Sequence, residues 1–456
     1  MSTMTVRRPL LGRRTPIERI LSPFQRFART ESSGGIVLIA CTLAALAWAN
    51  SPWWGGYERL WATELAFSLG GTGVSHSLHH WINDGLMAVF FFVVGLEIKR
   101  EVLVGELASV RKATLPIAAA LGGMLAPALI YTAVNGGGPG ARGWGIPMAT
   151  DIAFALGVLA LLGPRVPLSL KVFLAALAIV DDIGAVLVIA LFYTASISWT
   201  ALSAAAMVVG VLLVMNRLGA RQPVTYYLLA LALWAAFLES GVHATVAGVL
   251  AAILVPARTR IATGEFLERG RELMDEFDEA GEEGDTVLCN QRRQEAIHAL
   301  ERACEAAQAP LQRIEHQLQP WVSFGIVPLF ALANAGVHLS GEVVREVADP
   351  VAVGTILGLV VGKPLGITLF SWGVVRLGLA ARPDGVSWRD LHGVSWLGGI
   401  GFTMSLFISA LAFGADVRAT EAKVGILVAS LLAGGIGWLM LRRLGGEERR
   451  RTPRNT

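Results

Sequence analysis

Long apolar runs recur along the whole chain, separated by shorter stretches rich in glycine and charged residues. A helix needs ~20 mostly apolar residues to cross the hydrocarbon core of a bilayer, and twelve runs approach or exceed that length. The pattern predicts an all-α polytopic membrane protein with about 12 transmembrane helices. The runs lie at residues 34–50, 82–104, 113–134, 143–163, 168–193, 199–216, 224–240, 242–257, 321–338, 350–373, 391–413 and 424–443.

The overall composition points to the same class. Hydrophobic residues make up 54% of the 456 residues and charged residues only 16%, whereas soluble proteins carry about 25% charged residues. This balance excludes an ordinary soluble protein. The three cysteines have neither the spacing of a zinc site nor that of a disulfide framework. We expect no cofactor and no nucleic-acid partner.

Lysine and arginine are concentrated in alternate loops. The segment 1–33 carries seven arginines, and the tail 444–456 is also basic. Because short cytoplasmic loops are enriched in positive residues, an even number of spans with both termini in the cytoplasm fits the charges. We expect a multi-pass protein of a bacterial inner membrane, with spans 1–8 in residues 34–257 and spans 9–12 in residues 321–443.

The loop 258–320 interrupts the apolar pattern and is expected in the cytoplasm. Its stretch 259–309 contains thirteen acidic and six basic residues, a net charge of −7. Residues 265–278 and 292–308 have a composition typical of helices. A solvated connector with amphipathic helices fits this composition, and so does a regulatory element.

The loop 51–80, expected on the external side, contains two short alternating runs, 65–69 and 74–78, around a glycine-rich turn. Alternation on both sides of such a turn predicts a β-hairpin. Because a lone hairpin is marginally stable in water, its edge is a candidate for pairing with a second copy of the chain.

Ionisable residues inside the apolar runs are the best indicators of function, because each costs ~2.5–3.5 kcal/mol at the centre of a bilayer. Asp181 and Asp182 lie side by side near the middle of the fifth span. Neighbours on a helix point about 100° apart, so one carboxylate can face a cavity while the other meets another helix. The alternative is a span that ends one turn earlier and leaves both in water.

A second carboxylate, Asp151, follows Thr150 in the fourth span, just after Pro147. Proline disturbs a helix, and the freed carbonyls with the side chains of Thr150 and Asp151 would supply oxygen ligands. Hard cations such as Na⁺ prefer oxygen. The alternative is that Pro147 merely begins the span and leaves Asp151 near its aqueous end.

Lys363 lies in the tenth span beside glycines spaced four residues apart, from Gly354 to Gly366. Such a ladder allows another helix to approach closely, and a buried ammonium there should pair with a carboxylate. A lysine that snorkels to the membrane surface is the alternative. The segment is not a phosphate-binding loop, because Pro364 stands where that motif requires serine or threonine.

The eleventh span is also interrupted, by a cluster of glycines in residues 398–401. Corresponding broken helices in the two halves of a transporter indicate a binding site at the midplane. Together with the break near Pro147, this pattern predicts an inverted-repeat fold in which the fourth and eleventh spans are broken crossing helices.

At this point the chain resembles a known family. Its motifs are similar to those of the NhaA family of Na⁺/H⁺ antiporters over nearly the whole length from Gly34 to Arg443. The resemblance implies a secondary active antiporter that extrudes Na⁺ or Li⁺ in exchange for protons. It also implies two protons per Na⁺, regulation by pH and a homodimer. The motifs are residues 81–90, 95–101, 150–154, 178–184, 328–336, 362–366 and 398–405.

The resemblance also implies roles for single residues. Asp182 matches the principal Na⁺ ligand, and Asp181 the second essential carboxylate, which can pair with Lys363. Thr150 and Asp151 match broken-helix residues near the site. The cytoplasmic funnel associated with activation at alkaline pH is matched by Glu97, Arg100, Glu101 and Glu315. His243 matches a histidine linked to the pH profile, and Asp84 an acidic residue on the external side.

Two features depart from the family pattern. Gln319 stands where the family commonly has a histidine, so one titrating group near the funnel is missing. The stretch 259–309 is longer than in the shorter members. Both departures bear on the pH threshold, and neither alters the expected exchange.

Three other classes compete with an antiporter. A channel is disfavoured by the two broken spans and by the lack of a repeated filter sequence. An intramembrane enzyme is disfavoured because the chain has no His-Glu-x-x-His and no Gly-x-Ser-x-Gly motif. A proton-coupled transporter of an organic substrate would need aromatic or arginine groups in its cavity, which the sequence alone does not place.

Overall fold

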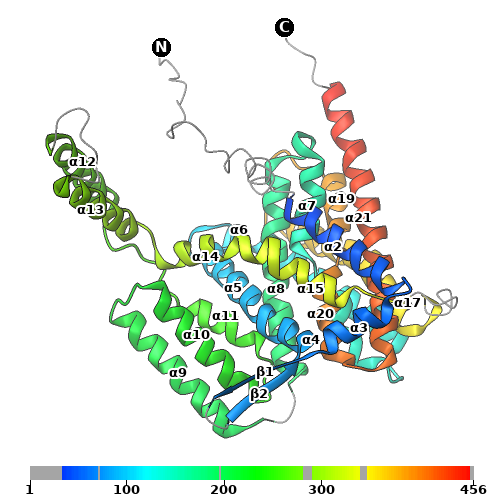
Figure 1. Ribbon diagram of the computed structural model, residues 1–456. Helices are drawn as coiled ribbons and strands as arrows, with labels where there is room; N and C mark the ends of the chain where they lie inside the picture. The colour runs from blue at the N-terminus through cyan, green and yellow to red at the C-terminus, as the bar shows by residue number, and fades with distance from the viewer. Residues whose placement is uncertain (1–32, 70–71, 195–196, 281–289, 339–346, 452–456) are drawn as a thin grey trace.

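The computed structural model describes residues 33–69, 72–194, 197–280, 290–338 and 347–451, and it is mostly helical (Figure 1). The first helices are α2 (Ser33–Ala49), α3 (Trp54–Ala62), α4 (Leu78–His80), α5 (Met87–Val104), α6 (Val110–Asn135), α7 (Ile152–Leu161) and α8 (Leu168–Phe192). They are followed by α9 (Trp199–Arg217), α10 (Pro223–Leu238), α11 (Thr245–Leu254), α12 (Thr263–Glu279), α13 (Gln291–Ala307) and α14 (Pro310–Trp321). The last helices are α15 (Val327–Asn334), α17 (Pro350–Leu357), α18 (Lys363–Arg376), α19 (Trp388–Gly398), α20 (Phe402–Phe413) and α21 (Val417–Arg451).

Tighter and wider helical turns connect several of these helices. Two are 3₁₀ segments, η2 (Ala141–Met148) and η3 (Gly163–Arg165), and three are π-helical, η1 (Trp81–Leu86), η5 (Val322–Ile326) and η6 (Gly358–Gly362). Two of the π segments lie just before a proline, Pro328 for η5 and Pro364 for η6. Proline has no N–H to bond to the preceding turn, which explains the wider turn at these two places.

Each of the twelve predicted apolar runs coincides with helical structure. By length and hydropathy, six helices among the described residues qualify as membrane spans, or eight if two bent pairs each count as one. The bent pairs are α2 with α3, at 114°, and α19 with α20, at 44°. The last helix extends beyond its predicted end, since α21 continues to Arg451. The arginines predicted to orient the N-terminus lie outside the described residues.

The fourth and eleventh runs are interrupted where the sequence predicts. The first break separates η2 from α7 at residues 149–151, and the second separates α19 from α20 at residues 399–401. The two breaks touch, since the Asp151 N–H donates to the Ile400 carbonyl at 2.7 Å. A further bond ties the arms together, because the Ser405 hydroxyl donates to the Ile146 carbonyl at 2.7 Å. Backbone carbonyls at each broken helix therefore accept hydrogen bonds from the other broken helix, so the breaks do not leave these carbonyls unpaired.

The glycine ladder of the tenth run packs against α6. A Cβ at Gly366 would lie 2.0 Å from the Gly122 carbonyl oxygen, and a Cβ at Gly362 would lie 2.8 Å from the Pro127 Cα. These positions therefore exclude any side chain. Because Lys363 follows Gly362 directly, the close approach of α18 and α6 carries its side chain into the centre of the bundle, where it is 0% exposed.

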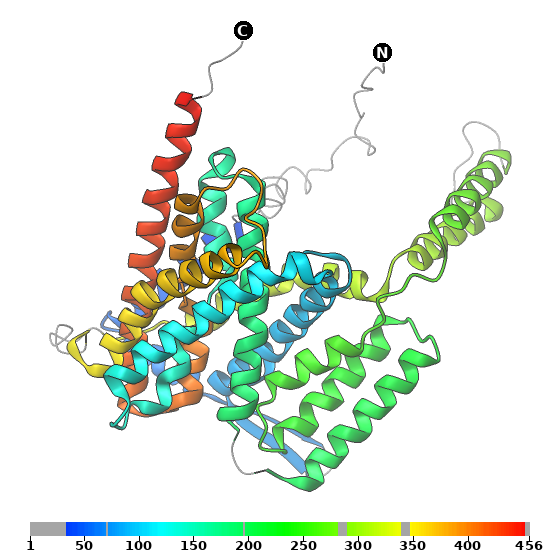
Figure 2. The ribbon, with the colours of Figure 1, turned by 180° about the vertical axis from the view of Figure 1, so that it is seen from behind.

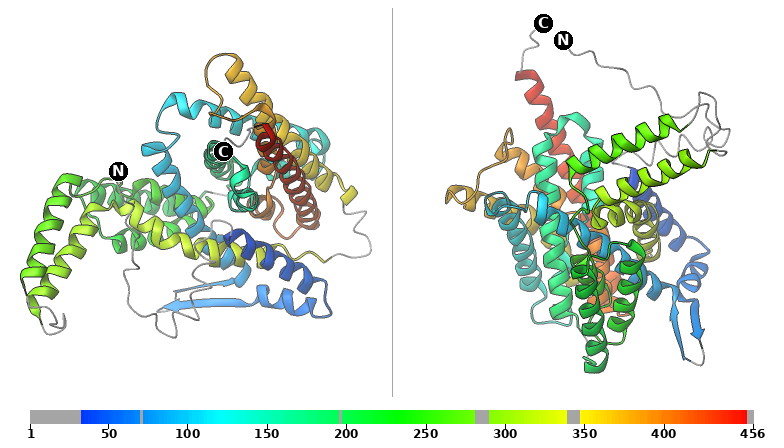
Figure 3. Two further views of the ribbon diagram at one scale, coloured as in Figure 1. Left: turned by 90° about the horizontal axis from the view of Figure 1, so that it is seen from above. Right: turned by 90° about the vertical axis from the view of Figure 1, so that its left-hand side faces the viewer.

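Two features project from the helical bundle. Strands β1 (Glu64–Leu69) and β2 (Thr72–Ser77) pair antiparallel, with Glu64 opposite Ser77, close to the alternating runs 65–69 and 74–78. Helices α12 and α13 pack against each other. They project from the end of the molecule opposite the β-hairpin, on the side away from α21 (Figure 3). They cover most of the two stretches with helical composition in the acidic loop.

Candidate functional site

The carboxylate pair lies in the middle of α8, and both side chains are buried. Asp181 is 1% exposed and Asp182 is 2% exposed. Helix α8 runs unbroken from Leu168 to Phe192, so the pair does not lie at a misplaced helix end. A span end in water is therefore excluded as the reason for these two residues.

Lys363 pairs with one of the two carboxylates. Its ammonium donates to Asp181 Oδ2 at 2.6 Å and to Thr150 Oγ1 at 2.8 Å. Lysine at this position does not snorkel, because the side chain and its partner are both completely buried. A buried ion pair requires good geometry and further hydrogen bonds to offset desolvation, and Thr150 supplies one of them.

The first break orients Thr150. Its hydroxyl donates to the Gly398 carbonyl at 2.8 Å, at the end of α19, and accepts from Lys363. A hydroxyl has one donor and two acceptor lone pairs, so Thr150 uses its donor on one broken helix and an acceptor on the lysine. The Thr150 side chain therefore links the break between α19 and α20 to the ion pair of Lys363 and Asp181.

Asp151 is engaged differently from the expectation that it would be an open cation ligand. Its Oδ1 accepts from the Phe154 N–H at 2.9 Å, which makes it the N-cap of α7. Its Oδ2 accepts from the Thr403 N–H at 3.1 Å and from the Thr403 hydroxyl. One buried carboxylate thus lies at the N-termini of α7 and α20, where two helix dipoles favour negative charge.

Thr403 is a site residue that the sequence did not single out. It lies two residues after the second break and bonds Asp151 through both its backbone and its side chain. The available signal was its position, because a hydroxyl residue directly after a glycine-rich break is well placed to meet the opposite broken helix.

Oxygen atoms of the α8 pair remain without a protein donor. Within the described residues, Asp181 Oδ1 is buried with no hydrogen-bond partner, and no hydrogen bond is found to Asp182. Buried polar atoms are normally paired, so an unpaired oxygen next to a second carboxylate suits a cation or a proton. The described residues contain no cluster of three or more histidine, cysteine or acidic side chains that could hold a metal ion.

The charges in this cluster do not balance. Asp181 and Lys363 together sum to zero, and Asp151 is compensated by two helix N-termini. Asp182 adds one negative charge that no described side chain neutralises by direct contact. A buried, unpaired carboxylate is costly, and it is relieved by taking up a proton or by binding a cation.

A second group of predicted residues lies at the C-terminal end of α5, the end nearer to α12 and α13. Arg100 forms an ion pair with Glu315 of α14 and lies 3.7 Å from Glu101 on its own helix. Glu101 also accepts from the Glu106 N–H at 3.0 Å. The pair between Arg100 and Glu315 joins α5 to the helix that follows the acidic hairpin.

Glu97 lies apart from these pairs, one turn deeper on α5. It lines a cavity of about 420 Å³ between α2, α5, α7 and the start of the ninth span. Gln319 and His316 line the same cavity. Ile152 and Ala153, which directly follow the first break, also line this cavity.

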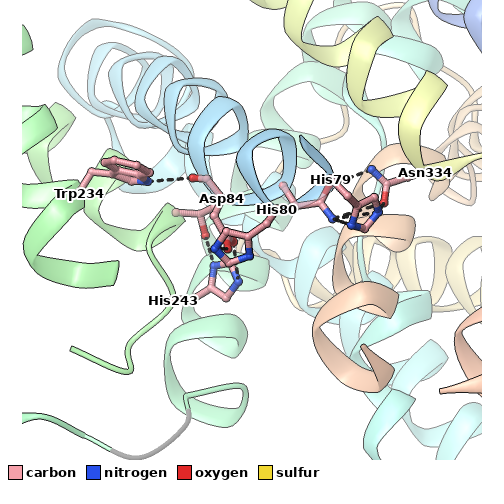
Figure 4. Close-up of polar contacts among 8 residues, drawn as sticks. His79, His80, Asp84, Trp234, His243 and Asn334 are labelled. Atoms are coloured by element: carbon pink, nitrogen blue, oxygen red, sulfur yellow. Dashed lines mark hydrogen bonds and ion pairs between the residues drawn. The ribbon is translucent and has the colours of Figure 1, made fainter. Parts of the chain in front are cut away.

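The third group is at the opposite end of the molecule, where η1 meets α11. Asp84 Oδ1 lies 3.4 Å from His243 Nε2, and Asp84 Oδ2 lies 3.1 Å from His80 Nε2 (Figure 4). The Trp234 indole donates to the Asp84 carbonyl at 2.9 Å. The sequence predicted Asp84 and His243 separately, and the structure brings them together. It adds His80, which the surrounding loop sequence did not mark.

Comparison with known proteins agrees with this architecture. The family model for Na⁺/H⁺ antiporter 1 matches residues 25–441. The chain belongs to this family. The Na⁺/H⁺ antiporter NhaA of Oleidesulfovibrio alaskensis is 52% identical over 94% of this chain and 95% of its own length. The Koribacter versatilis antiporter NhaA is 53% identical over 94% and 93%, and NhaA 2 of Sorangium cellulosum is 47% identical over 97% and 96%.

In this NhaA-family chain the eleven predicted site residues lie in three groups, with His243 beside Asp84. The midplane cluster contains the α8 pair, Lys363, Thr150 and Asp151. The funnel group contains Glu97, Arg100, Glu101 and Glu315, and the third pair is Asp84 with His243. Helix α5 connects two of these groups, because it carries Glu97, Arg100 and Glu101 and follows directly on η1, which carries Asp84.

The buried ion pair generates a stability prediction. Replacing Lys363 with alanine leaves Asp181 buried without its partner, which should cost about 3–5 kcal/mol. Replacing both, as Asp181→Asn with Lys363→Gln, removes the two charges and should recover most of that loss. The measurement is the thermal midpoint of the purified protein in detergent. Arg269→Ala is the control, because its ion pair with Glu272 is exposed and worth about 1 kcal/mol or less. A double variant no more stable than Lys363→Ala would contradict this account.

Proposed function

We propose that this protein is a secondary active antiporter that exchanges Na⁺ for H⁺, with Asp182 as the principal group that binds either ion. The supporting observation is one buried carboxylate without a partner beside a neutral ion pair, at the point where two broken helices cross. The names of the relatives, all Na⁺/H⁺ antiporters, agree with this proposal.

Exchange follows from competition at the same oxygens. A proton on Asp182 removes the charge that attracts Na⁺, and bound Na⁺ raises the cost of protonation. If the cluster is open to one side of the membrane at a time, the exclusion becomes coupled exchange. The two helix breaks provide backbone that can shift without breaking a regular helix, as in other inverted-repeat transporters.

The same cluster bears on stoichiometry and on the ion. With two carboxylates available, two protons per Na⁺ would move one net charge per cycle. The membrane potential would then contribute ~2.3 kcal/mol per 100 mV. Both Na⁺ and Li⁺ prefer oxygen ligands, so we include Li⁺ as a substrate.

The membrane topology is part of the same proposal. We infer twelve spans in an inverted repeat, with both termini in the cytoplasm of a bacterial inner membrane. The coincidence of all twelve apolar runs with helical structure supports the number, and the alternation of basic loops supports the orientation. The acidic hairpin of α12 and α13 would then lie in the cytoplasm and the β-hairpin outside.

Regulation by pH is proposed for the funnel group. Burial raises the pKa of the Glu315 carboxyl above its ordinary value, and the Arg100 guanidinium partly opposes this rise. As pH falls, Glu315 takes up a proton at a higher pH than an exposed glutamate does, and its ion pair with Arg100 weakens. As pH rises, the pair forms and joins α5 to α14, which accounts for activation at alkaline pH.

The first prediction tests the ion site. Asp182→Asn should abolish Na⁺-driven proton movement while leaving the folded protein in the membrane, because asparagine binds neither Na⁺ nor a proton at this place. The measurement is pH-gradient dequenching in proteoliposomes with Na⁺, Li⁺ and K⁺. Asp416→Asn, whose ion pair with Arg418 is exposed, should exchange normally. Exchange near the wild-type rate by a well-folded Asp182→Asn protein would disprove the proposal.

A further prediction concerns pH. Glu315→Gln mimics the protonated side chain at every pH, so its charged pair with Arg100 never forms and the activation at alkaline pH should be largely lost. The measurement is the exchange rate between pH 6 and 9 at saturating Na⁺. Asp416→Asn is the control, since its pair with Arg418 is exposed and remote from the funnel. Unchanged activation at alkaline pH in Glu315→Gln would show that this pair does not set the pH response.

The β-hairpin supports a proposal about assembly. Both strands have a free edge, and such edges pair readily with another strand. We infer a homodimer in which two hairpins meet across a two-fold axis. Deleting residues 65–78 should give monomers that still exchange Na⁺ for H⁺, measured by light scattering in detergent and by dequenching. A deletion variant that remains fully dimeric would reject this role of the hairpin.

A further inference from the structure

A groove unrelated to the ion site lies between the first turns of α6 and α8. It has a volume of about 660 Å³, and its third wall is the segment 377–387 that joins α18 to α19. Figure 2 shows α6 in cyan crossing α8 in green, below the orange loop. The groove is at the end of the molecule that we place in the cytoplasm.

The floor of the groove is apolar. Leu115 and Phe173 are buried beneath it, and Val172 on its wall is 37% exposed. The apolar surface continues along the outer face of α6, where Ile117 and Leu121 are 41% and 44% exposed. An acyl chain could therefore follow α6 from the groove into the bilayer.

The rim of the groove carries four charges that sum to zero. Arg111 and Lys112 begin α6, Glu106 precedes it, and Asp384 is on the opposite loop. Arg111 forms no ion pair or hydrogen bond with a described residue, and the Lys112 ammonium lies 3.5 Å from Glu106. The Ser169 hydroxyl donates to the Asp384 carbonyl at 2.9 Å and holds the loop against α8. Two cations and two carboxylates thus surround the opening.

These charges select a type of head group. A phosphate diester suits Arg111 and Lys112, but a purely anionic lipid would place no positive charge against Glu106 and Asp384. A choline head group carries a positive charge but has no N–H to donate to carboxylates. A primary ammonium supplies both the charge and the donors.

We propose that this groove binds a zwitterionic phospholipid with a primary ammonium, of the phosphatidylethanolamine type. The phosphate lies on Arg111 and Lys112, the ammonium on Glu106 and Asp384, and one acyl chain along the floor formed by Leu115 and Phe173. The bound lipid would join α6, α8 and the loop 377–387. Because α8 carries the carboxylate pair, occupancy should raise the thermal stability of the helices that hold the ion site.

The test measures lipid binding by native mass spectrometry of the delipidated full-length protein in detergent. Phosphatidylethanolamine, phosphatidylcholine and phosphatidylglycerol with the same acyl chains are compared, along with soluble glycerophosphoethanolamine. Phosphatidylethanolamine should bind about tenfold more tightly than either other lipid, as expected for one lost charge-assisted hydrogen bond. Glycerophosphoethanolamine, which has no chain, should bind weakly.

Variants separate the two halves of the rim. Glu106→Gln with Asp384→Asn should abolish the preference over phosphatidylcholine, and Arg111→Gln with Lys112→Gln should weaken all three lipids. Arg269→Gln with Glu272→Gln, an exposed pair on α12, is the matched control and should change nothing. All the rim positions are at the surface, and the thermal midpoint without lipid shows whether each variant is folded.

Three results would overturn the proposal. Tighter binding of phosphatidylglycerol would identify an anionic-lipid site instead. Equal binding of glycerophosphoethanolamine would show that the apolar floor holds no chain. An unchanged lipid preference in folded rim variants would place the lipid elsewhere on the protein.

Discussion

The structure depends on one buried lysine that neutralises one of two adjacent carboxylates. Lys363 satisfies Asp181 and Thr150 and leaves Asp182 as a single uncompensated charge. With both carboxylates paired, the cluster would be inert, and with neither paired, the bundle would contain two buried negative charges. In the proposed function the odd count is what makes the site responsive to protons and cations, because either of them relieves the imbalance.

Close packing makes this pairing possible. Glycines 362 and 366 let α18 approach the α6 backbone, where no Cβ would fit, and so bring Lys363 to the crossing of the broken helices. Asp151 holds that crossing together from the other side, since it caps both α7 and α20. Stabilising two helix ends with one carboxylate explains how two breaks can lie inside a membrane protein without exposed backbone groups.

Two further charged groups lie at the two ends of the protein. The Arg100–Glu315 pair links α5 to the helix after the acidic hairpin, while Asp84 meets two histidines at the opposite end. The groove proposed to bind lipid is separate from both, but it lies on α8, which carries Asp181, and on α6, which packs against α18.

The sequence by itself determined the membrane class, the apolar runs, the two breaks and the identity of the charged residues within them. These are local properties, because hydropathy, glycine and proline act over one or two helical turns. The family resemblance added the expected pairing of Asp181 with Lys363. Only the tertiary structure decided the other partners: Thr150 with Lys363, 213 residues apart, and Asp151 with Thr403, 252 residues apart. It also showed that Asp151 is a double helix cap and that His80 accompanies Asp84. Such contacts depend on how far helices approach and on the direction of each side chain, and hydropathy along the chain encodes neither.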